Sequence, residues 1–182
     1  MHTPPPETLL DKTFVPYLLA DALEARIATM AQALNTAYAE QTVLLMPVLT
    51  GALRFTAALL PHLQFPYQLA CVQIGTYGQA MQAQAQPQYL LAPPQPLPPL
   101  PILLLEDIVD QGHTLDFLVE DLQARGATAV ACASLLFKPA AHKGRHRPQH
   151  IGFEIPTAFV VGYGLDYAQQ GRHLPHIYQL AP

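Results

Sequence analysis

The sequence predicts an α/β fold in which a mostly parallel, twisted sheet is flanked by helices. Short apolar runs, typical of buried strands, alternate along the chain with apolar stripes at spacings of three and four, typical of amphipathic helices. The chain has 182 residues and is 51% hydrophobic, which suffices for the core of one compact domain. We therefore expect a single domain over residues 1–182.

The predicted elements alternate in the order that such a sheet requires. The first half of the chain predicts a helix, a strand, a tight turn, a second helix and a buried strand, at residues 17–39, 43–49, 50–51, 53–60 and 67–74. The second half predicts a strand, a helix that stops near Gly126, and two more strands, at residues 102–105, 115–125, 130–137 and 159–163. Pro47 has no N–H to donate, so we expect an irregularity inside the first strand.

Residues 76–100 interrupt this alternation. They are rich in Gln, Ala and Pro, and only residues 89–91 resemble a strand. An irregular insertion of this length in a compact domain is usually a lid over a site or a linker. There is no second predicted domain for it to link, so we favour a mobile loop that covers an active site.

Composition narrows the classes of function. The formal net charge is -4 and the nine Lys and Arg residues are scattered, which argues against a nucleic-acid partner. No apolar stretch reaches membrane-spanning length, and the first residues do not resemble a targeting signal, so we expect no membrane partner. Cys71 and Cys132 lie in apolar runs and are interpreted as buried free thiols, which favours a cytoplasmic location.

Three histidines, His142, His146 and His150, recur every four residues and could imitate a metal site. Gly144 and Pro148 argue against the continuous helix that would align them, and no cysteine or carboxylate joins them in sequence. We therefore interpret this segment as a solvated basic loop.

The most informative segment is residues 103–114, LLLEDIVDQGHT. A buried strand ends, two acids follow, and residues 110–114 open a helix. Backbone N–H groups at a helix start, together with the helix dipole, can hold a phosphate without a lysine, and Gly112 lets the backbone approach it closely. In parallel sheets, ligands bind beyond the carboxyl ends of the strands, where this turn would lie.

Glu106 and Asp107 are neighbours on an extended segment, so their side chains diverge. Two carboxylates beside a phosphate site would repel the phosphate unless they bind another group, and the two hydroxyls of a ribose fit. Their charge would also favour the cationic centre that forms when a group leaves the anomeric carbon. Asp110, three residues on, could take or share a proton of an incoming base. The alternative for each acid is a plain helix cap that meets solvent.

Residues 103–114 resemble the phosphoribosyl pyrophosphate motif of the phosphoribosyltransferases. Residues 152–156 (GFEIP) and 159–167 (FVVGYGLDY) resemble the C-terminal signature of the hypoxanthine-guanine phosphoribosyltransferases, and residues 48–55 and 76–77 are also similar. The resemblance implies the type I fold, with a small hood formed by the N- and C-terminal segments. It also implies transfer of a 5-phosphoribosyl group to N9 of hypoxanthine or guanine, giving IMP or GMP in purine salvage.

The resemblance implies a role for each matching residue. Glu106 and Asp107 would hold the ribose hydroxyls, and Asp110 would handle the proton at purine N7. Lys138 would donate a hydrogen bond to the purine 6-oxo group, and Phe159 would stack on the base. The implied sites are the 5'-phosphate site (Asp110, Gln111, Gly112, His113, Thr114), the purine site (Lys138, Phe159, Val160, Asp166), the pyrophosphate site (Leu49, Thr50, Gly51, Arg172), the metal site (Glu106, Asp107, Asp166) and the mobile loop (Thr76, Tyr77).

The resemblance further implies Mg²⁺ as cofactor, phosphoribosyl pyrophosphate and a 6-oxopurine as partners, and a homodimer or homotetramer. Thr50 stands where the family often has lysine, and Gln73 where some relatives have a basic residue. The pyrophosphate turn would then bind chiefly through backbone N–H groups around a cis peptide at Leu49-Thr50. Two alternatives stay open: a non-catalytic regulator that senses phosphoribosyl pyrophosphate or nucleotides on the same fold, and a transferase that prefers xanthine.

Overall fold

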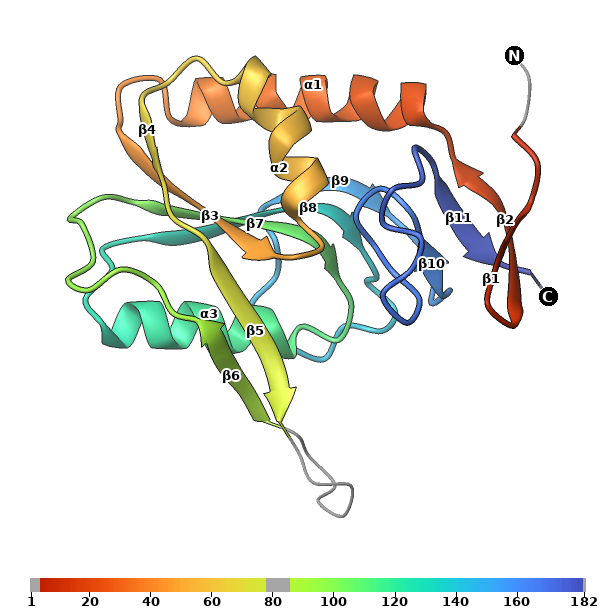
Figure 1. Cartoon of the computed structure of the whole chain (residues 1–182). Coiled ribbons are helices and arrows are strands. Elements are labelled where there is room, and N and C mark those ends of the chain that lie inside the picture. Colours follow the sequence, from red (N-terminus) through yellow and green to blue (C-terminus); the bar gives the residue numbers. More distant parts are fainter. Residues whose placement is uncertain (1–3, 78–85, 182) are drawn as a thin grey trace.

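The computed structural model describes residues 4–77 and 86–181, which form two sheets and three α-helices (Figure 1). In chain order the elements are β1 (Glu7–Leu9), β2 (Lys12–Leu18), α1 (Ala20–Ala37), β3 (Val43–Leu49), α2 (Leu53–Leu59), the 3-10 turn η1 (Leu60–His62), β4 (Tyr67–Leu69), β5 (Val72–Tyr77), β6 (Gln86–Leu91), β7 (Ile102–Val109), α3 (His113–Ala124), β8 (Val130–Phe137), β9 (His150–Glu154), β10 (Val160–Val161) and β11 (Ile177–Leu180).

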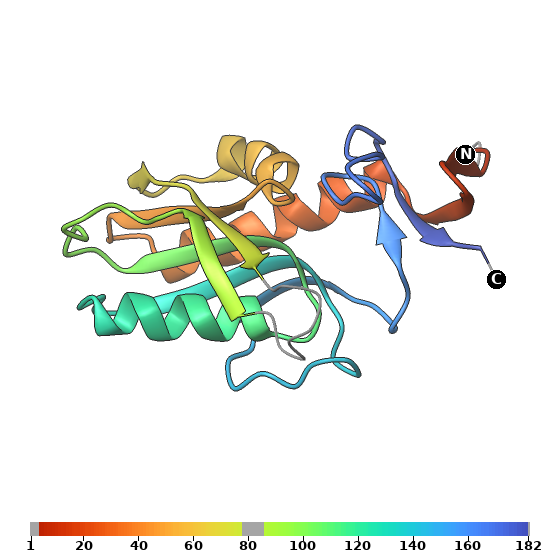
Figure 2. The same cartoon turned by 60° about the horizontal axis from the view of Figure 1, so that its bottom comes forward.

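The larger sheet has the order β6-β5-β3-β7-β8-β9, with β4 also paired to β3. Every pair in it is parallel except β5 with β6, which confirms the mostly parallel α/β sheet. Helices α1 and α2 cover one face and α3 covers the other (Figure 2). Because neighbouring residues of a strand face opposite sides, Leu103 and Leu105 pack with α1 and α2, while Leu104 packs with α3.

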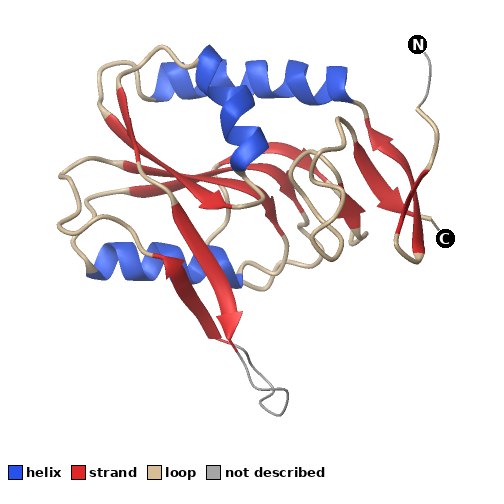
Figure 3. Ribbon diagram, viewed as in Figure 1, coloured by secondary structure: helices blue, strands red, loops and turns tan. Residues whose placement is uncertain are grey.

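A second, antiparallel sheet of order β1-β2-β11-β10 brings both ends of the chain together beside the larger sheet (Figure 3). Its core contains Phe14, Val161 and Tyr178. This is the hood that the resemblance implies. The apolar residues 159–163 were expected to be a strand of the main sheet, and that expectation was wrong. Only Val160–Val161 forms a strand, because Gly162 at φ +95° ends it. This short strand pairs with β11 of the hood.

Pro47 lies where β3 changes partners. On one edge, β3 pairs with β4 through residues 43–45 and with β5 from Val48 onward. Backbone N–H groups alternate between the two edges of a strand, and that of Val43 faces the β4 side. Position 47 therefore faces the same side, in the gap between the two partners. β3 itself runs unbroken from Val43 to Leu49 and keeps a regular register with β7, so the expected irregularity inside the strand is not seen. The missing N–H falls where the described sheet has no ladder bond to lose.

The expected single strand over residues 67–74 is two strands. All three residues of β4 are exposed, with Tyr67 at 40% and Leu69 at 50%, whereas Val72 is buried. The apolar composition suggested burial throughout, but β4 only touches the start of β3 at the edge of the sheet. Cys71, in the break between the strands, is half-buried rather than buried; Cys132 is buried, and both are free thiols.

Part of the segment that was expected to be irregular, residues 86–91, is a strand of a hairpin, whereas residues 92–100 contain no helix or strand. β5 and β6 pair antiparallel and project from the sheet as an arm (Figure 1). Its base is tied to α3, because Tyr89 Oη donates to Asp121 Oδ2 over 2.7 Å. Arg125, at the end of α3, donates to the same oxygen and so holds the Asp121 carboxylate in place. Thr76 and Tyr77 end β5, and residues 78–85 of the expected mobile loop lie outside the described residues. Within the described residues, no helix has the length and apolarity needed to cross a membrane.

Candidate active site

The turn between β7 and α3 has the geometry that its sequence predicts. β7 ends at Val109, α3 begins at His113, and Gly112 between them has φ +91°. A Cβ at Gly112 would lie 2.7 Å from His142 Nε2, so both the backbone angle and the close neighbour require glycine. The first N–H groups of α3 have no partner within the helix, which leaves them free to bind an anion.

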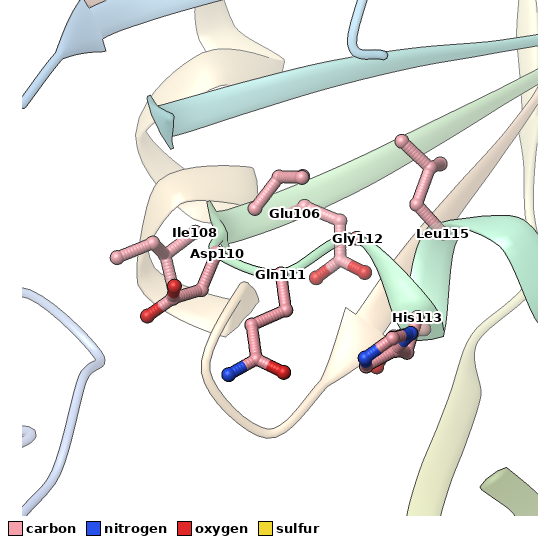
Figure 4. Close-up of a pocket in the computed structure, with 9 residues that line it drawn as sticks. Glu106, Ile108, Asp110, Gln111, Gly112, His113 and Leu115 are labelled. Atoms are coloured by element: carbon pink, nitrogen blue, oxygen red, sulfur yellow. The ribbon is translucent and has the colours of Figure 1, made fainter. Parts of the chain in front are cut away.

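This turn borders a hollow of about 350 Å³. Its lining is Glu106, Ile108, Val109, Asp110, Gln111, Gly112, His113, Thr114 and Leu115. Figure 4 shows the Glu106 carboxylate on the side of the turn where His113 begins α3, whereas the Asp110 carboxylate lies on the other side, next to Ile108. All five residues predicted for a phosphate site thus line one hollow, and Glu106 lines it as well.

Glu106 and Asp107 diverge as expected. Glu106 is 5% exposed and lines the phosphate-turn hollow, whereas Asp107 lines a second hollow of about 260 Å³. Burial raises the pKa of Glu106 well above its ordinary value, and the neighbouring Asp107 charge raises it further. Burial also raises the pKa of Asp107 to about 6, although the backbone N–H of Ile108 and the charge of Arg172 oppose the rise. In both acids, burial is the main cause that disfavours the ionised form.

The second hollow contains the residues that the resemblance assigns to the base. Asp107, Ile108, Asp110, Lys138, Phe159, Val160, Leu165 and Asp166 line it. Lys138 is only 6% exposed, and its Nζ lies 2.5 Å from Asp110 Oδ2. Lys138 is thus not the solvated surface lysine that is common at strand ends.

Phe159 lines this hollow and is 47% exposed, so it is not a core residue. Its ring lies 6.2 Å from that of Phe14 and 5.9 Å from that of Tyr167, measured between centroids. Tyr167 Oη in turn donates to Asp11 over 2.7 Å. The hood therefore supports one face of the Phe159 ring. Phe14 and Asp11 were not predicted for the site, because they lie about 150 residues away from Phe159 and Tyr167 along the chain.

The turn after β3 packs against the carboxylate of Asp107. The expected cis peptide is present between Leu49 and Thr50. A Cβ at Gly51 would collide with the Asp107 carboxylate, and one at Gly164 would collide with the Gly51 carbonyl oxygen. Gly164 has φ +104°, so it also needs glycine for its backbone angle. Its role was not predicted, although the YG pair in the tail was a signal for it.

Arg172 binds within the tail, through Gly164 and Asp166. Its Nη1 donates to the Gly164 carbonyl over 2.8 Å, and its Nη2 lies 2.7 Å from Asp166 Oδ1. The structure therefore brings the predicted residues of the phosphate, purine and pyrophosphate sites together around β7. Thr76 and Tyr77 are placed only by their backbone, at the end of β5.

Comparison with known proteins gives the family. The model of the phosphoribosyl transferase domain matches residues 17–168, which is most of the chain. A hypoxanthine-guanine phosphoribosyltransferase of Bacillus subtilis is 33% identical over 162 residues, covering 89% of this chain and 90% of that protein. The chain belongs to the hypoxanthine-guanine phosphoribosyltransferase family.

Other members of the family agree. The hypoxanthine phosphoribosyltransferase of Salmonella typhimurium is 32% identical over 157 residues, covering 85% of this chain and 88% of that protein. A crystal structure of a hypoxanthine-guanine phosphoribosyltransferase from Bacillus anthracis superposes with a TM-score of 0.85 at 25% identity, covering 91% of this chain and 98% of that one. A hypoxanthine phosphoribosyltransferase from Staphylococcus aureus gives a TM-score of 0.85 at 26% identity, covering 92% and 91%. The type I fold is thereby shown.

The acids suit a divalent cation that is held largely by substrate. Asp166 Oδ1 faces Arg172 and its Oδ2 accepts from Gln169 N, while Asp107 Oδ1 accepts from Ile108 N. Among the described residues, no three or more His, Cys, Asp or Glu side chains form a metal-holding group. Mg²⁺ commonly binds through one or two carboxylates together with substrate phosphates and waters. These carboxylates therefore fit a Mg²⁺ ion whose other ligands come from a phosphorylated substrate.

Proposed function

We propose that the protein transfers the 5-phosphoribosyl group of phosphoribosyl pyrophosphate to N9 of hypoxanthine or guanine, forming IMP or GMP and pyrophosphate in purine salvage. The observation that carries the proposal is the buried Lys138, paired with Asp110 beside the phosphate turn. A cation that donates hydrogen bonds and a carboxylate that accepts a proton suit the O6 and N7 edge of a 6-oxopurine.

The phosphate turn and the two acids bind the ribose 5-phosphate in this proposal. Backbone N–H groups of residues 111–114 hold the 5'-phosphate, and the start of α3 adds a favourable dipole. Glu106 and Asp107 hold the ribose hydroxyls, and their negative charge stabilises the cationic anomeric carbon of the transition state. Burial raises the pKa of both acids, and positive charge that develops beside them would favour their ionised forms, so each carboxylate would interact more strongly with the transition state than with the empty site.

The second hollow holds the base. Phe159 stacks on it, the backbone of Val160 contacts its edge, and Lys138 donates to the 6-oxo oxygen. Adenine carries an amino group at that position, and two donors facing each other are unfavourable, so adenine is a poor substrate. Asp110 accepts or shares the N7 proton as N9 attacks the anomeric carbon.

The turn at Leu49, Thr50 and Gly51 and the side chain of Arg172 bind pyrophosphate. Glu106, Asp107 and Asp166 hold Mg²⁺ with its waters and the substrate. Magnesium, when bound, neutralises the negative charge that develops on the leaving pyrophosphate.

Residues 76–100, with Thr76 and Tyr77 at the end of β5, act as the mobile active-site loop of one domain that covers residues 1–182. Closure of such a loop excludes water, which would compete with the purine for the anomeric carbon. We also propose a cytoplasmic homodimer or homotetramer with no nucleic-acid partner.

The deciding experiment mixes the protein with phosphoribosyl pyrophosphate, MgCl₂ and hypoxanthine, guanine, xanthine or adenine, and separates the products by chromatography. Formation of IMP or GMP supports the proposal, and a higher kcat/KM for xanthine would shift the base preference. Absence of any nucleotide product, together with measurable binding of phosphoribosyl pyrophosphate, would instead favour a non-catalytic regulator.

A further inference from the structure

The loop between β8 and β9 reaches the phosphate turn. The backbone N–H groups of Lys143 and Gly144 both donate to the carbonyl oxygen of Gln111, over 3.0 and 3.1 Å. The ring of His142 lies beneath Gly112 and packs edge-on against Phe137, with 5.3 Å between ring centroids. The segment is a loop whose basic residues Lys143, Arg145 and Arg147 are exposed, as interpreted from the sequence, and its backbone also packs on the phosphate turn.

Asp116, in the first turn of α3, holds the same loop from the other side. Its Oδ2 accepts from Arg145 N over 2.9 Å, and its Oδ1 accepts from His146 N over 2.8 Å and faces His146 Nδ1 at 3.0 Å. Burial raises the pKa of Asp116, but these hydrogen bonds outweigh it and lower the pKa overall. A Cβ at Gly144 would lie 2.9 Å from Asp116 Oδ2, so glycine is what allows the carboxylate this close to the loop backbone.

The two sets of contacts fix one peptide plane. In a trans peptide, the carbonyl of one residue and the N–H of the next point in opposite directions. The Gln111 carbonyl is held toward the loop by two donors, so the N–H of Gly112 points the other way, toward the phosphate-turn hollow that both residues line. If the loop moved, this peptide could rotate, and the Gly112 N–H would no longer be preorganised to bind a phosphate.

We propose that Asp116 is a positioning residue for 5'-phosphate binding. It anchors residues 144–146, residues 143–144 hold the Gln111 carbonyl, and that carbonyl orients the Gly112 N–H toward the phosphate. Asp116 itself does not touch the ligand. The inference rests on the proposed function, because the phosphate in question is that of the substrate and of the IMP product.

The test compares two ligands that differ only in the 5'-phosphate. Calorimetry of IMP and of inosine with the full chain gives two dissociation constants, and their ratio isolates the contribution of the phosphate. In Asp116→Ala, IMP binding is expected to weaken about tenfold while inosine binding stays within about twofold, since a hydrogen bond to a charged group is at stake. Asp116→Asn keeps one acceptor oxygen and should lose less.

The matched control is Glu120→Gln. Glu120 lies one turn further along α3 and pairs with the guanidinium of Arg145, so it also ties the loop to the helix. It does not receive the backbone N–H groups of the loop, and its removal should leave the IMP to inosine ratio unchanged. A direct readout is the ¹⁵N-resolved amide signal of Gly112, which IMP should shift in the wild type and shift less in Asp116→Ala.

Two outcomes overturn the inference. One is an unchanged IMP to inosine ratio in a folded Asp116→Ala; the other is equal weakening of both ligands, which would mean that Asp116 only supports the fold. If Asp116→Ala fails to fold, Gly144→Ala makes the same prediction, because the added methyl group pushes the carboxylate off the loop. A wild type that binds IMP no better than inosine and forms no nucleotide contradicts the proposed function itself, and this result differs from a defect confined to the variants.

Discussion

Lys138 Nζ lies 2.5 Å from Asp110 Oδ2, and the two side chains differ sharply in exposure, at 8% for the lysine and 44% for the aspartate. The buried ammonium is fixed by its pair with Asp110, and the half-exposed carboxylate of Asp110 remains accessible to a ligand in the second hollow. Removing either partner changes the site differently, and the two changes give separate predictions.

Asp110→Asn should keep the hydrogen-bonding shape of the side chain but lose its ability to take the N7 proton. We expect kcat to fall by about 10²- to 10⁴-fold, while the dissociation constant of phosphoribosyl pyrophosphate changes little. Steady-state kinetics and calorimetry measure the two quantities. Unchanged kcat would show that another group handles the proton.

Lys138→Met should keep the volume of the side chain and remove its hydrogen-bond donors. We expect kcat/KM for hypoxanthine to fall about 100-fold, because the 6-oxo oxygen loses a charged partner, and the ratio of hypoxanthine to adenine use to fall with it. Binding of phosphoribosyl pyrophosphate in the absence of base serves as the internal control. If both bases lose activity to the same extent, Lys138 does not select the base.

Thr50→Lys should restore the positive charge that relatives often carry in the pyrophosphate turn. Thr50 is exposed, so a lysine there fits without repacking, and we expect KM for phosphoribosyl pyrophosphate to fall about threefold at low salt, with a smaller gain at high salt. Leu53→Lys is the matched control, since Leu53 is 57% exposed on α2 and its lysine adds the same charge outside the turn. Equal gains in both variants would point to a general charge effect.

Asp107→Asn should stabilise the fold at neutral pH in metal-free buffer. The unfolded chain releases the Asp107 proton near pH 3.8, whereas the folded chain keeps it until about pH 6. Between these values the folded state binds more protons, so the free energy of unfolding falls as pH rises, by about 3 kcal/mol in all. Asp107→Asn carries no carboxyl group at this position, so its free energy of unfolding does not fall for this reason as pH rises.

The Asp107→Asn variant should therefore be more stable than the wild type at pH 8 and similar to it near pH 3.5. Urea unfolding at both pH values gives the comparison. Glu40→Gln, at an exposed acid after α1, controls for the loss of a charge. A stability difference that does not depend on pH would contradict the assignment.

The sequence predicted those parts of the fold in which pattern and environment agree. The expected strand 130–137 matches β8, because a run that is apolar except for Ser134 is favoured to lie between two other strands of a buried sheet. It did not predict that residues 67–69 lie exposed at an edge, since apolar composition does not reveal which strand ends a sheet. Residues 159–161 joined the hood for a similar reason: a short apolar strand fits either sheet.

The site was predictable where its residues are neighbours in sequence. Residues 106–114 form one strand and one turn, so their relative positions follow from local geometry. The brace between Asp116 and His146 joins side chains 30 residues apart, and the support of Phe159 by Phe14 spans far more. Such pairs depend on how β8, β9 and the hood pack, which no local pattern records.

The opposite orientations of Glu106 and Asp107 have a consequence for how this protein can change over evolution. One acid belongs to the hollow of the phosphate turn, and the other to the hollow that contains Lys138 and Phe159. Ile108 and Asp110 line both hollows, so substitutions that adapt the chain to a new base would leave sugar-phosphate binding intact only at residues such as Phe159 and Leu165, which line the second hollow alone. A single residue inserted in β7 before Glu106 would turn each acid toward the opposite hollow and so disturb both hollows at once. The length of β7 is therefore more strongly constrained than the residues that line only the second hollow.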